Sequence, residues 1–181
     1  MSSDLPQLLR LRMEVISTDA AHTTTERLTG LYGCVDELIR TYRPVYVAIE
    51  LPAAKGLPPR AQGFSGTPMT ITQYAMAVGV AYGRCISPWQ DADTRLMVSP
   101  PRVMGYPVDT WSRGRGIPGT RDDPYKQKRA TYAALVWGGG EGMFGCKTKA
   151  KDIADAALLA WVAMSDLEMQ SRNQQFRLSG E

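Results

Sequence analysis

Hydrophobic and polar residues follow one another along this chain in patterns that predict alternating strands and helices. Residues 9–17 alternate between apolar and polar side chains, as in a strand with one polar face. Residues 45–49 form a short run rich in β-branched residues, which is typical of a central strand. The expected elements are strands at 9–17, 45–49 and 95–99, and helices at 23–42, 67–84, 124–137 and 150–169. This order favours an α/β domain in which helices pack against a sheet.

Capping and turn residues indicate where the helices begin and end. Thr23 and Glu26 have the spacing of a capping box, in which each residue's side chain accepts the other's backbone N–H. Pro44 disfavours helix for the residue before it, so the first helix should end near Tyr42. Three consecutive glycines at 138–140 should end the third helix.

The segments between these elements predict loops within a single domain. Residues 51–66 are rich in proline, glycine and alanine, and residues 104–122 are rich in glycine, proline and arginine. We expect both to be loops, so that 1–181 is one domain. Residues 170–181 are polar and are expected to form a frayed tail.

The composition fits one folded domain and excludes several other classes of protein. Of 181 residues, 44% are hydrophobic and 22% are charged, which is ordinary for a chain that buries a core. These values exclude a disordered tail protein, a coiled coil and a collagen-like fibre. The sequence has no apolar stretch long enough to span a bilayer and no visible secretory signal, so we expect no membrane partner.

The numbers of cysteines and histidines limit which disulfides and metal sites the chain could form. The chain has three cysteines, Cys34, Cys85 and Cys146, which is an odd number, and none has CxxC spacing. This pattern argues against a disulfide framework and favours a reducing compartment such as the cytoplasm. His22 is the one histidine in the sequence, so a zinc site lacks nitrogen and sulfur ligands. Any metal would have to be bound by carboxylates, which select Mg²⁺ or Mn²⁺.

Basic residues are concentrated in one part of the chain. Residues 101–151 hold ten Lys/Arg against four Asp/Glu, whereas the whole chain has a net charge of +3. A basic segment of this kind is typical of a protein that binds a phosphate backbone. A solvated basic loop would have the same composition, so charge leaves both interpretations open.

Three acidic residues occupy positions that suggest a function. Two lie in a predicted apolar helix, where acids are unusual, and one lies at the end of a predicted strand, where ligand sites are common. Asp155 interrupts an otherwise apolar helix, and aspartate is rarely buried unless it is paired or bound to a cation. Asp152 lies one turn earlier on the same helix face, where both acids could instead stabilise the helix N-terminus. Glu50 ends a predicted central strand, and ligand sites of α/β sheets lie at such ends. Together the three predict a divalent-cation site for phosphodiester cleavage.

These motifs resemble those of the RuvC family of Holliday junction resolvases. Residues 45–50 resemble the family's second acidic motif, and residues 151–160 resemble its closing Asp-x-x-Asp motif. Residues 124–129 lie where the family carries a lysine-bearing helix, and residues 98–103 fit its last strand. The resemblance runs in order over roughly residues 13–168.

The resemblance implies an RNase H-like fold with a mixed sheet flanked by helices, and a homodimer that makes paired nicks in four-way DNA junctions. It implies that Glu50, Asp152 and Asp155 are catalytic and bind Mg²⁺ or Mn²⁺, and that Lys126 stabilises the scissile phosphate. The alternative for Lys126 is an ordinary surface lysine. Residues 67–84 lie where the family forms its dimer interface, although their methionines would equally suit the monomer's core. The basic residues expected to bind the DNA backbone are Arg113, Arg115, Arg121, Lys128, Arg129, Lys149 and Lys151.

The family's first acidic motif, a central strand bearing an aspartate followed by glycine, has no counterpart in this sequence. Three explanations remain open: a start site placed too late, a rearranged sheet in which Asp19 or Glu14 substitutes, or a degenerate domain that binds DNA without cutting it. The alternative function is therefore a non-catalytic protein that binds junctions or acts as a scaffold. A different RNase H-like nuclease, of the transposase or RNA-cleaving kind, is a third possibility.

Overall fold

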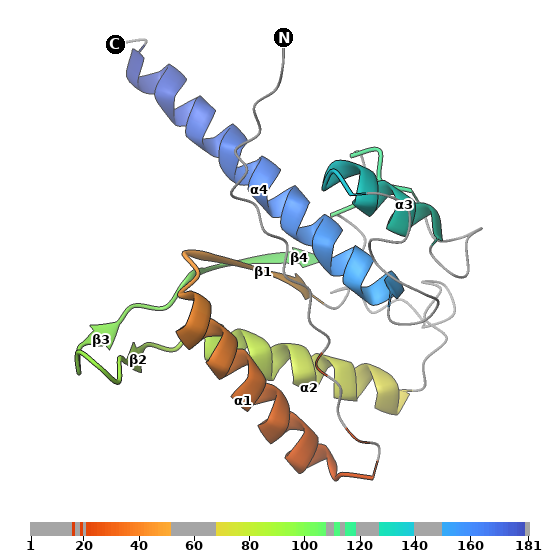
Figure 1. Ribbon diagram of the computed structural model, residues 1–181, viewed down its shortest axis with the longest axis vertical. Helices are drawn as coiled ribbons and strands as arrows, with labels where there is room; N and C mark the ends of the chain where they lie inside the picture. Colours follow the sequence, from red (N-terminus) through yellow and green to blue (C-terminus); the bar gives the residue numbers. More distant parts are fainter. Residues whose placement is uncertain are drawn as a thin grey trace.

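The computed structural model describes residues 16, 19, 21–51, 68–107, 111–112, 115–118, 127–139 and 150–179, without the side chains of 68–70, 150–151 and 176–179. The elements are α1 (Thr24–Tyr42), β1 (Tyr46–Leu51), α2 (Pro68–Cys85), β2 (Trp89–Gln90), β3 (Met97–Val98), β4 (Arg102–Pro107), α3 (Gln127–Val136) and α4 (Ala150–Ser179) (Figure 1). The predicted α/β class is confirmed. The strand expected at 9–17 lies outside the described residues except for Ile16, which is not in a strand.

Helix α1 begins and ends where its sequence predicts. The backbone N–H of Glu26 donates to Thr23 Oγ1 at 3.3 Å, and the backbone N–H of Thr23 donates to Glu26 Oε2 at 2.7 Å, which completes the capping box. After Tyr42 the chain turns at Arg43, whose φ of 45° is left-handed, and Pro44 follows. Local side chains therefore determine both ends of this helix.

Strand β1 pairs in parallel with β4, in a register that sets Glu50 opposite Tyr106. A parallel pair needs a crossover connection, and α2 with the β2–β3 hairpin lies between the two strands in sequence. The strand predicted at 95–99 is wrong in extent, because only Met97–Val98 are extended there and β4 occupies part of the loop predicted at 104–122. Gly105 suits this pairing because a Cβ there would lie 2.5 Å from Leu51 Cδ1.

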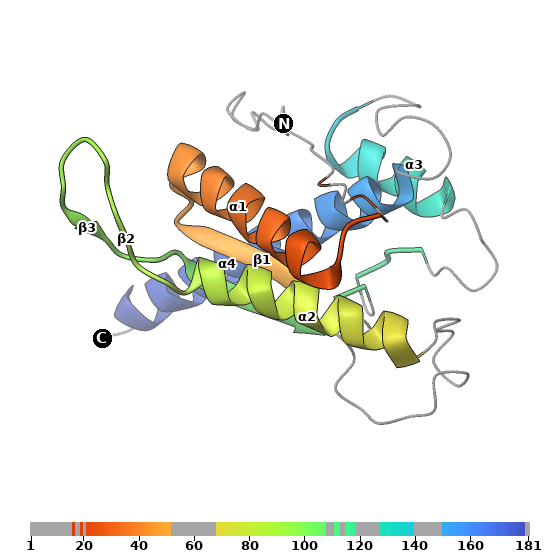
Figure 2. The same cartoon turned by 90° about the horizontal axis from the view of Figure 1, so that it is seen from below.

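Helices cover both faces of the β1–β4 pair. Helices α1 and α2 lie side by side on one face, and α4 with α3 against it lies on the other (Figure 1, Figure 2). Val47 and Ile49 of β1 pack toward the core of α1 and α2, whereas Ala48 packs toward the core of α3 and α4. Because strand side chains alternate, Glu50 belongs to the same face as Ala48.

Helix α4 is longer than its apolar pattern predicts. It continues to Ser179, so residues 170–179 are helical and the frayed tail expected from residue 170 is wrong for them. The segment contains Gln, Arg and Leu, which favour helix, and it has no glycine or proline before Gly180. In Figure 1 this end of α4 projects beyond the strands. No helix in the described part of the chain has the length and hydrophobicity to cross a membrane.

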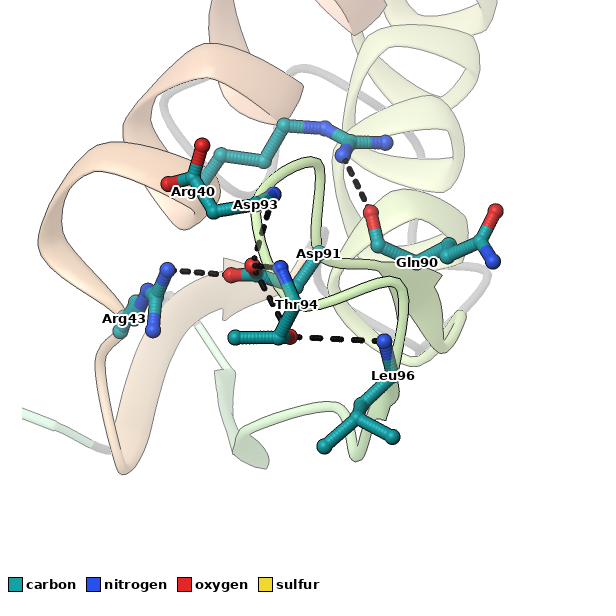
Figure 3. Close-up of polar contacts among 7 residues, drawn as sticks. All are labelled: Arg40, Arg43, Gln90, Asp91, Asp93, Thr94 and Leu96. Atoms are coloured by element: carbon teal, nitrogen blue, oxygen red, sulfur yellow. Dashed lines mark hydrogen bonds and ion pairs between the residues drawn. The ribbon is translucent and has the colours of Figure 1, made fainter.

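The β2–β3 hairpin projects beyond the amino-terminal ends of β1 and β4, the same end of the pair as the carboxyl end of α4 (Figure 1, Figure 2), and it is held by charged side chains (Figure 3). Asp91 Oδ1 accepts hydrogen bonds from the backbone N–H groups of Asp93 and Thr94, at 3.1 and 2.9 Å. Arg43 forms an ion pair with the other oxygen of Asp91, and Arg40 donates to the backbone oxygen of Gln90 at 3.1 Å. Two-stranded hairpins are marginally stable alone, so these bonds to α1 support it.

Arg84, in the last turn of α2, provides further charged contacts near the hairpin. It is 2% exposed, pairs with Asp36 of α1, and donates to the backbone oxygen of Ser87 at 3.1 Å. Its Nη2 has no hydrogen-bond partner among the described residues, and the guanidinium lies 5.4 Å from the centre of the Trp89 ring. A buried cation with an acid and an aromatic face is stabilised on both sides.

We predict that Asp91→Asn lowers the melting temperature at neutral pH and that its difference from the wild type disappears in acid. The backbone N–H of Thr94, the strongest of several donors, holds the pKa of Asp91 below its ordinary value of 3.8. A carboxyl with a lowered pKa stabilises the folded state above its ordinary pKa, and this stabilisation is lost as the pH falls through the folded-state pKa. Thermal unfolding followed by circular dichroism, from neutral pH to about pH 2, measures the effect.

Asp93→Asn is the matched control, because Asp93 is exposed in the same turn and contributes its backbone N–H to Asp91. This variant should melt like the wild type at every pH. Equal losses in the two variants, or a loss in Asp91→Asn that persists in acid, would contradict the prediction.

Candidate functional site

Glu50 lies near the carboxyl end of β1, where both of its carboxylate oxygens accept hydrogen bonds. The indole Nε1–H of Trp111 donates to Oε2 at 2.8 Å, and the hydroxyl of Tyr74 on α2 donates to Oε1 at 3.2 Å. Burial, the charge of Glu50 and this hydrogen bond raise the pKa of Tyr74 to about 12. The hydroxyl is therefore a permanent donor to Glu50 at neutral pH.

Asp155 lies on α4, where its carboxylate pairs with an arginine of the neighbouring helix. Arg129 Nη1 of α3 donates to Asp155 Oδ1 at 3.0 Å, and the two side chains are 11% and 16% exposed. Arg129 Nε donates to the backbone oxygen of Pro118 at 2.8 Å. The guanidinium carbon also lies 5.1 Å from the centre of the Trp111 ring, within cation–π range.

Trp111 and Arg129 therefore connect two of the three predicted catalytic carboxylates, Glu50 and Asp155. A continuous series of contacts runs through five side chains, and we call it the acidic network. Its members, in order, are Tyr74, Glu50, Trp111, Arg129 and Asp155. It joins α2, β1, α3 and α4 through the segment at Trp111. Trp111 is 2% exposed and belongs to the core between α3 and α4, so the network rests on packed apolar side chains.

The third predicted ligand, Asp152, is exposed one helical turn before Asp155. Glu50, Asp152 and Asp155 all lie within the described residues, and no three acidic, histidine or cysteine side chains of that part of the chain form a group able to hold a metal ion. Their oxygen atoms are the donors that Mg²⁺ and Mn²⁺ prefer. The arrangement does not fit a metal site, because Arg129 and Trp111 occupy oxygens that a metal would need.

A second, half-buried ion pair lies further along α4. Arg115 pairs with Asp166, and the hydroxyl of Tyr106 on β4 donates to Asp166 Oδ2 at 3.1 Å. Burial and the hydrogen bond to Asp166 raise the pKa of Tyr106 to about 12. These contacts fasten β4 to α4, and the guanidinium of Arg115, predicted to bind DNA, is engaged by a carboxylate of its own chain.

The remaining predicted residues divide into those that the structure describes and those that it does not. Lys128 is exposed in the first turn of α3. Asp19, a proposed substitute for the missing aspartate, forms the turn before α1, with its Oδ1 accepting the backbone N–H of Ala21 at 2.9 Å. The predicted residues outside the described part of the chain are Glu14, Arg113, Arg121, Lys126 and Lys149, together with the side chain of Lys151.

Two members of the acidic network, Trp111 and Tyr74, were not anticipated from the sequence. Trp111 lies in the glycine-rich and proline-rich segment that predicts a loop. A tryptophan in such a segment carries a large apolar surface and one N–H donor, which together signal a buried anchor with a hydrogen-bond partner. Tyr74 carries no comparable signal, because a tyrosine on an apolar helix is ordinary.

Comparison with known proteins bears on the fold. No protein-family model matches this sequence, and no curated protein matches it. Among solved structures, the chain is similar to that of RuvC from Thermus thermophilus, with a TM-score of 0.53 and 20% sequence identity. The similarity covers 88% of this chain and 79% of that one. The fold of this protein is therefore RuvC-like over most of its length.

Proposed function

We propose that this protein is a structure-selective endonuclease that nicks four-way DNA junctions, in the manner implied by its resemblance to the RuvC family. The observation that carries the proposal is the acidic network, in which Glu50 of β1 and Asp155 of α4 lie in one connected series within a RuvC-like fold. The motifs around these two acids are those that suggest the family from sequence.

The proposed roles of the residues follow from their chemistry. Hydrolysis of a phosphodiester requires activation of water and stabilisation of the charge that develops on the phosphate. Glu50, Asp152 and Asp155 would supply the carboxylates, and Lys126 with its neighbours Lys128 and Arg129 would supply positive charge. The resemblance also implies Mg²⁺ or Mn²⁺, but the described carboxylates do not form a metal-binding group, so we assign no step to a metal.

The basic segment at 101–151 is the proposed surface for DNA. Its excess of positive charge would attract the phosphate backbone irrespective of sequence. Lys128 is exposed on α3, one residue before Arg129 of the acidic network, so its ammonium is accessible to DNA. A homodimer, as implied by the resemblance, would present two such sites to the two strands that are nicked.

A second candidate is a protein that binds junctions without cutting them. The ion pair between Arg129 and Asp155 favours it, because a carboxylate whose charge is already balanced by an arginine is a poor ligand for a metal. The two candidates differ in one measurable property, which is hydrolysis of the bound junction.

We predict that the full-length protein nicks a labelled four-way junction in the presence of Mg²⁺ or Mn²⁺, at symmetric positions. Asp155→Asn and Glu50→Gln should each lower the nicking rate by about 10²-fold or more, because they remove a charged oxygen from the reacting centre. Denaturing electrophoresis of the products measures the rate, and circular dichroism checks that each variant is folded.

Glu168→Gln is the matched control for nicking, because Glu168 is an exposed acid on α4 away from the acidic network. Its rate should equal that of the wild type. Tight binding of the junction without any hydrolysis, even at high Mn²⁺, would reject the nuclease and support the binding protein. Faster cleavage of an RNA–DNA hybrid or of linear duplex would instead indicate another RNase H-like nuclease.

We also predict that junction affinity falls steeply with salt and that Lys128→Gln makes this dependence shallower by about one unit of log–log slope, the effect of losing one phosphate contact. Fluorescence anisotropy with a labelled junction and a chelator, at several salt concentrations, separates binding from cleavage. Arg172→Gln is the control, since Arg172 is exposed on α4 outside the basic segment. A larger loss of slope in the control than in Lys128→Gln would place the DNA elsewhere.

A further inference from the structure

The acidic network contains a cation that belongs to the protein. The guanidinium of Arg129 is held by the Asp155 carboxylate at 3.0 Å, by the backbone oxygen of Pro118 at 2.8 Å and by the face of Trp111 at 5.1 Å. It is 11% exposed, so it differs from the loosely held arginines of most surface ion pairs. Three contacts of different kinds fix its position.

This cation contacts one of the carboxylates that a metal ion would need as a ligand. A divalent ion needs the carboxylate oxygens as direct ligands, and a guanidinium already on Asp155 Oδ1 would repel it. On the other side of the network, Oε2 of Glu50 accepts the indole N–H of Trp111. Arg129 and Trp111 thus occupy oxygens of Asp155 and Glu50, and their contact with each other connects the two carboxylates.

We propose that Arg129 is the resident cation of the acidic network in the DNA-free protein, and that a divalent metal binds at Asp155 only in competition with Arg129. This inference concerns the regulation of the same site and rests on the proposed function for its biological meaning. A phosphodiester is a strong ligand for guanidinium, so DNA that binds Arg129 competes with the Asp155 carboxylate for it. The coupling is reciprocal, because whatever favours release of Arg129 also favours the metal.

The competition distinguishes Arg129 from Arg115, which also pairs with an aspartate of α4. Arg115 pairs with Asp166 and lies further along α4, where Tyr106 also donates to Asp166. Neither Asp166 nor Arg115 contacts Glu50 or Asp155 in the contacts described for them. Removal of Arg115 therefore breaks an ion pair of the same type without opening the acidic network.

Binding of Mn²⁺ alone to the full chain, without DNA, tests the proposal. Electron paramagnetic resonance of free Mn²⁺ gives the dissociation constant for the wild type, Arg129→Gln and Arg115→Gln. We expect Arg129→Gln to bind Mn²⁺ about tenfold more tightly than the wild type, which is a typical size for coupling between competing ligands. Arg115→Gln should bind Mn²⁺ like the wild type.

Two further variants keep the test decisive. The double variant Arg129→Gln/Asp155→Asn should lose the added affinity, which locates the gain at Asp155. Arg129→Lys retains the charge but not the planar fork or the stacking on Trp111, so it should show an intermediate gain even if Arg129→Gln does not fold. Thermal unfolding identifies the variants that are folded.

Equal Mn²⁺ affinity in the wild type, Arg129→Lys and Arg129→Gln would overturn the proposal, as would a gain that persists in the double variant. The failure of this inference is distinguishable from failure of the proposed function. Nicking of junctions without any competition for Mn²⁺ would reject the resident cation alone, whereas competition without nicking would reject the nuclease alone.

Discussion

The contact between Arg129, Trp111 and Asp155 is the interaction on which the candidate site depends. A charge removed from water must be matched by a partner, and here the partner of each charge comes from a different part of the chain. Ion pairs on open surfaces contribute about 0–1 kcal/mol because water competes for both ends. At 11% and 16% exposure, and with an indole against the guanidinium, this pair is shielded from much of that competition. It therefore fixes where α3 and α4 meet the end of β1.

The same physical rule shapes the opposite end of the molecule. Arg84 is buried against Asp36 and Trp89, and Asp91 collects backbone and arginine donors at the hairpin turn. Between these two ends lies the parallel pair of β1 and β4, with a helical core on each face. The sheet thus separates two apolar cores, and paired charges hold the segments that extend beyond it. Small strands suffice because the helices bury their faces.

This arrangement gives the two proposed functions a shared structural basis. Glu50 at the end of β1 and Asp155 on α4 lie within one network, as the proposed hydrolysis of a phosphodiester would require. The same network neutralises the aspartate with an arginine, which suits binding without hydrolysis. Whether DNA phosphate can take Arg129 from Asp155 is the physical question that separates them. A site with its own cation would also be protected from metals until the nucleic acid arrives.

Much of this fold, but less of the candidate site, could be predicted from the sequence. Local sequence signals were sufficient to predict both ends of α1, because a capping box and a proline act within a few residues of those ends. They also placed β1 and the acids on it and on α4. The sequence predicts a strand at 95–99 and not the strand β4. Gly105 and Pro107 are typical loop residues, and only the pairing of β4 with β1 makes them part of a strand. The length of α4 was underestimated because apolar periodicity ends before helix propensity does.

The sequence by itself determined which residues carry charge, which positions are apolar, and where most helices begin or end. Only the tertiary structure decided that Trp111 donates to Glu50 and that Arg129 pairs with Asp155. These contacts join residues far apart in the chain, and their energy depends on distance and on exclusion of water rather than on neighbours in sequence. An aspartate paired with an arginine and an aspartate accessible to a metal are the same residue in the sequence. The fold gives them different neighbours and therefore different chemistry.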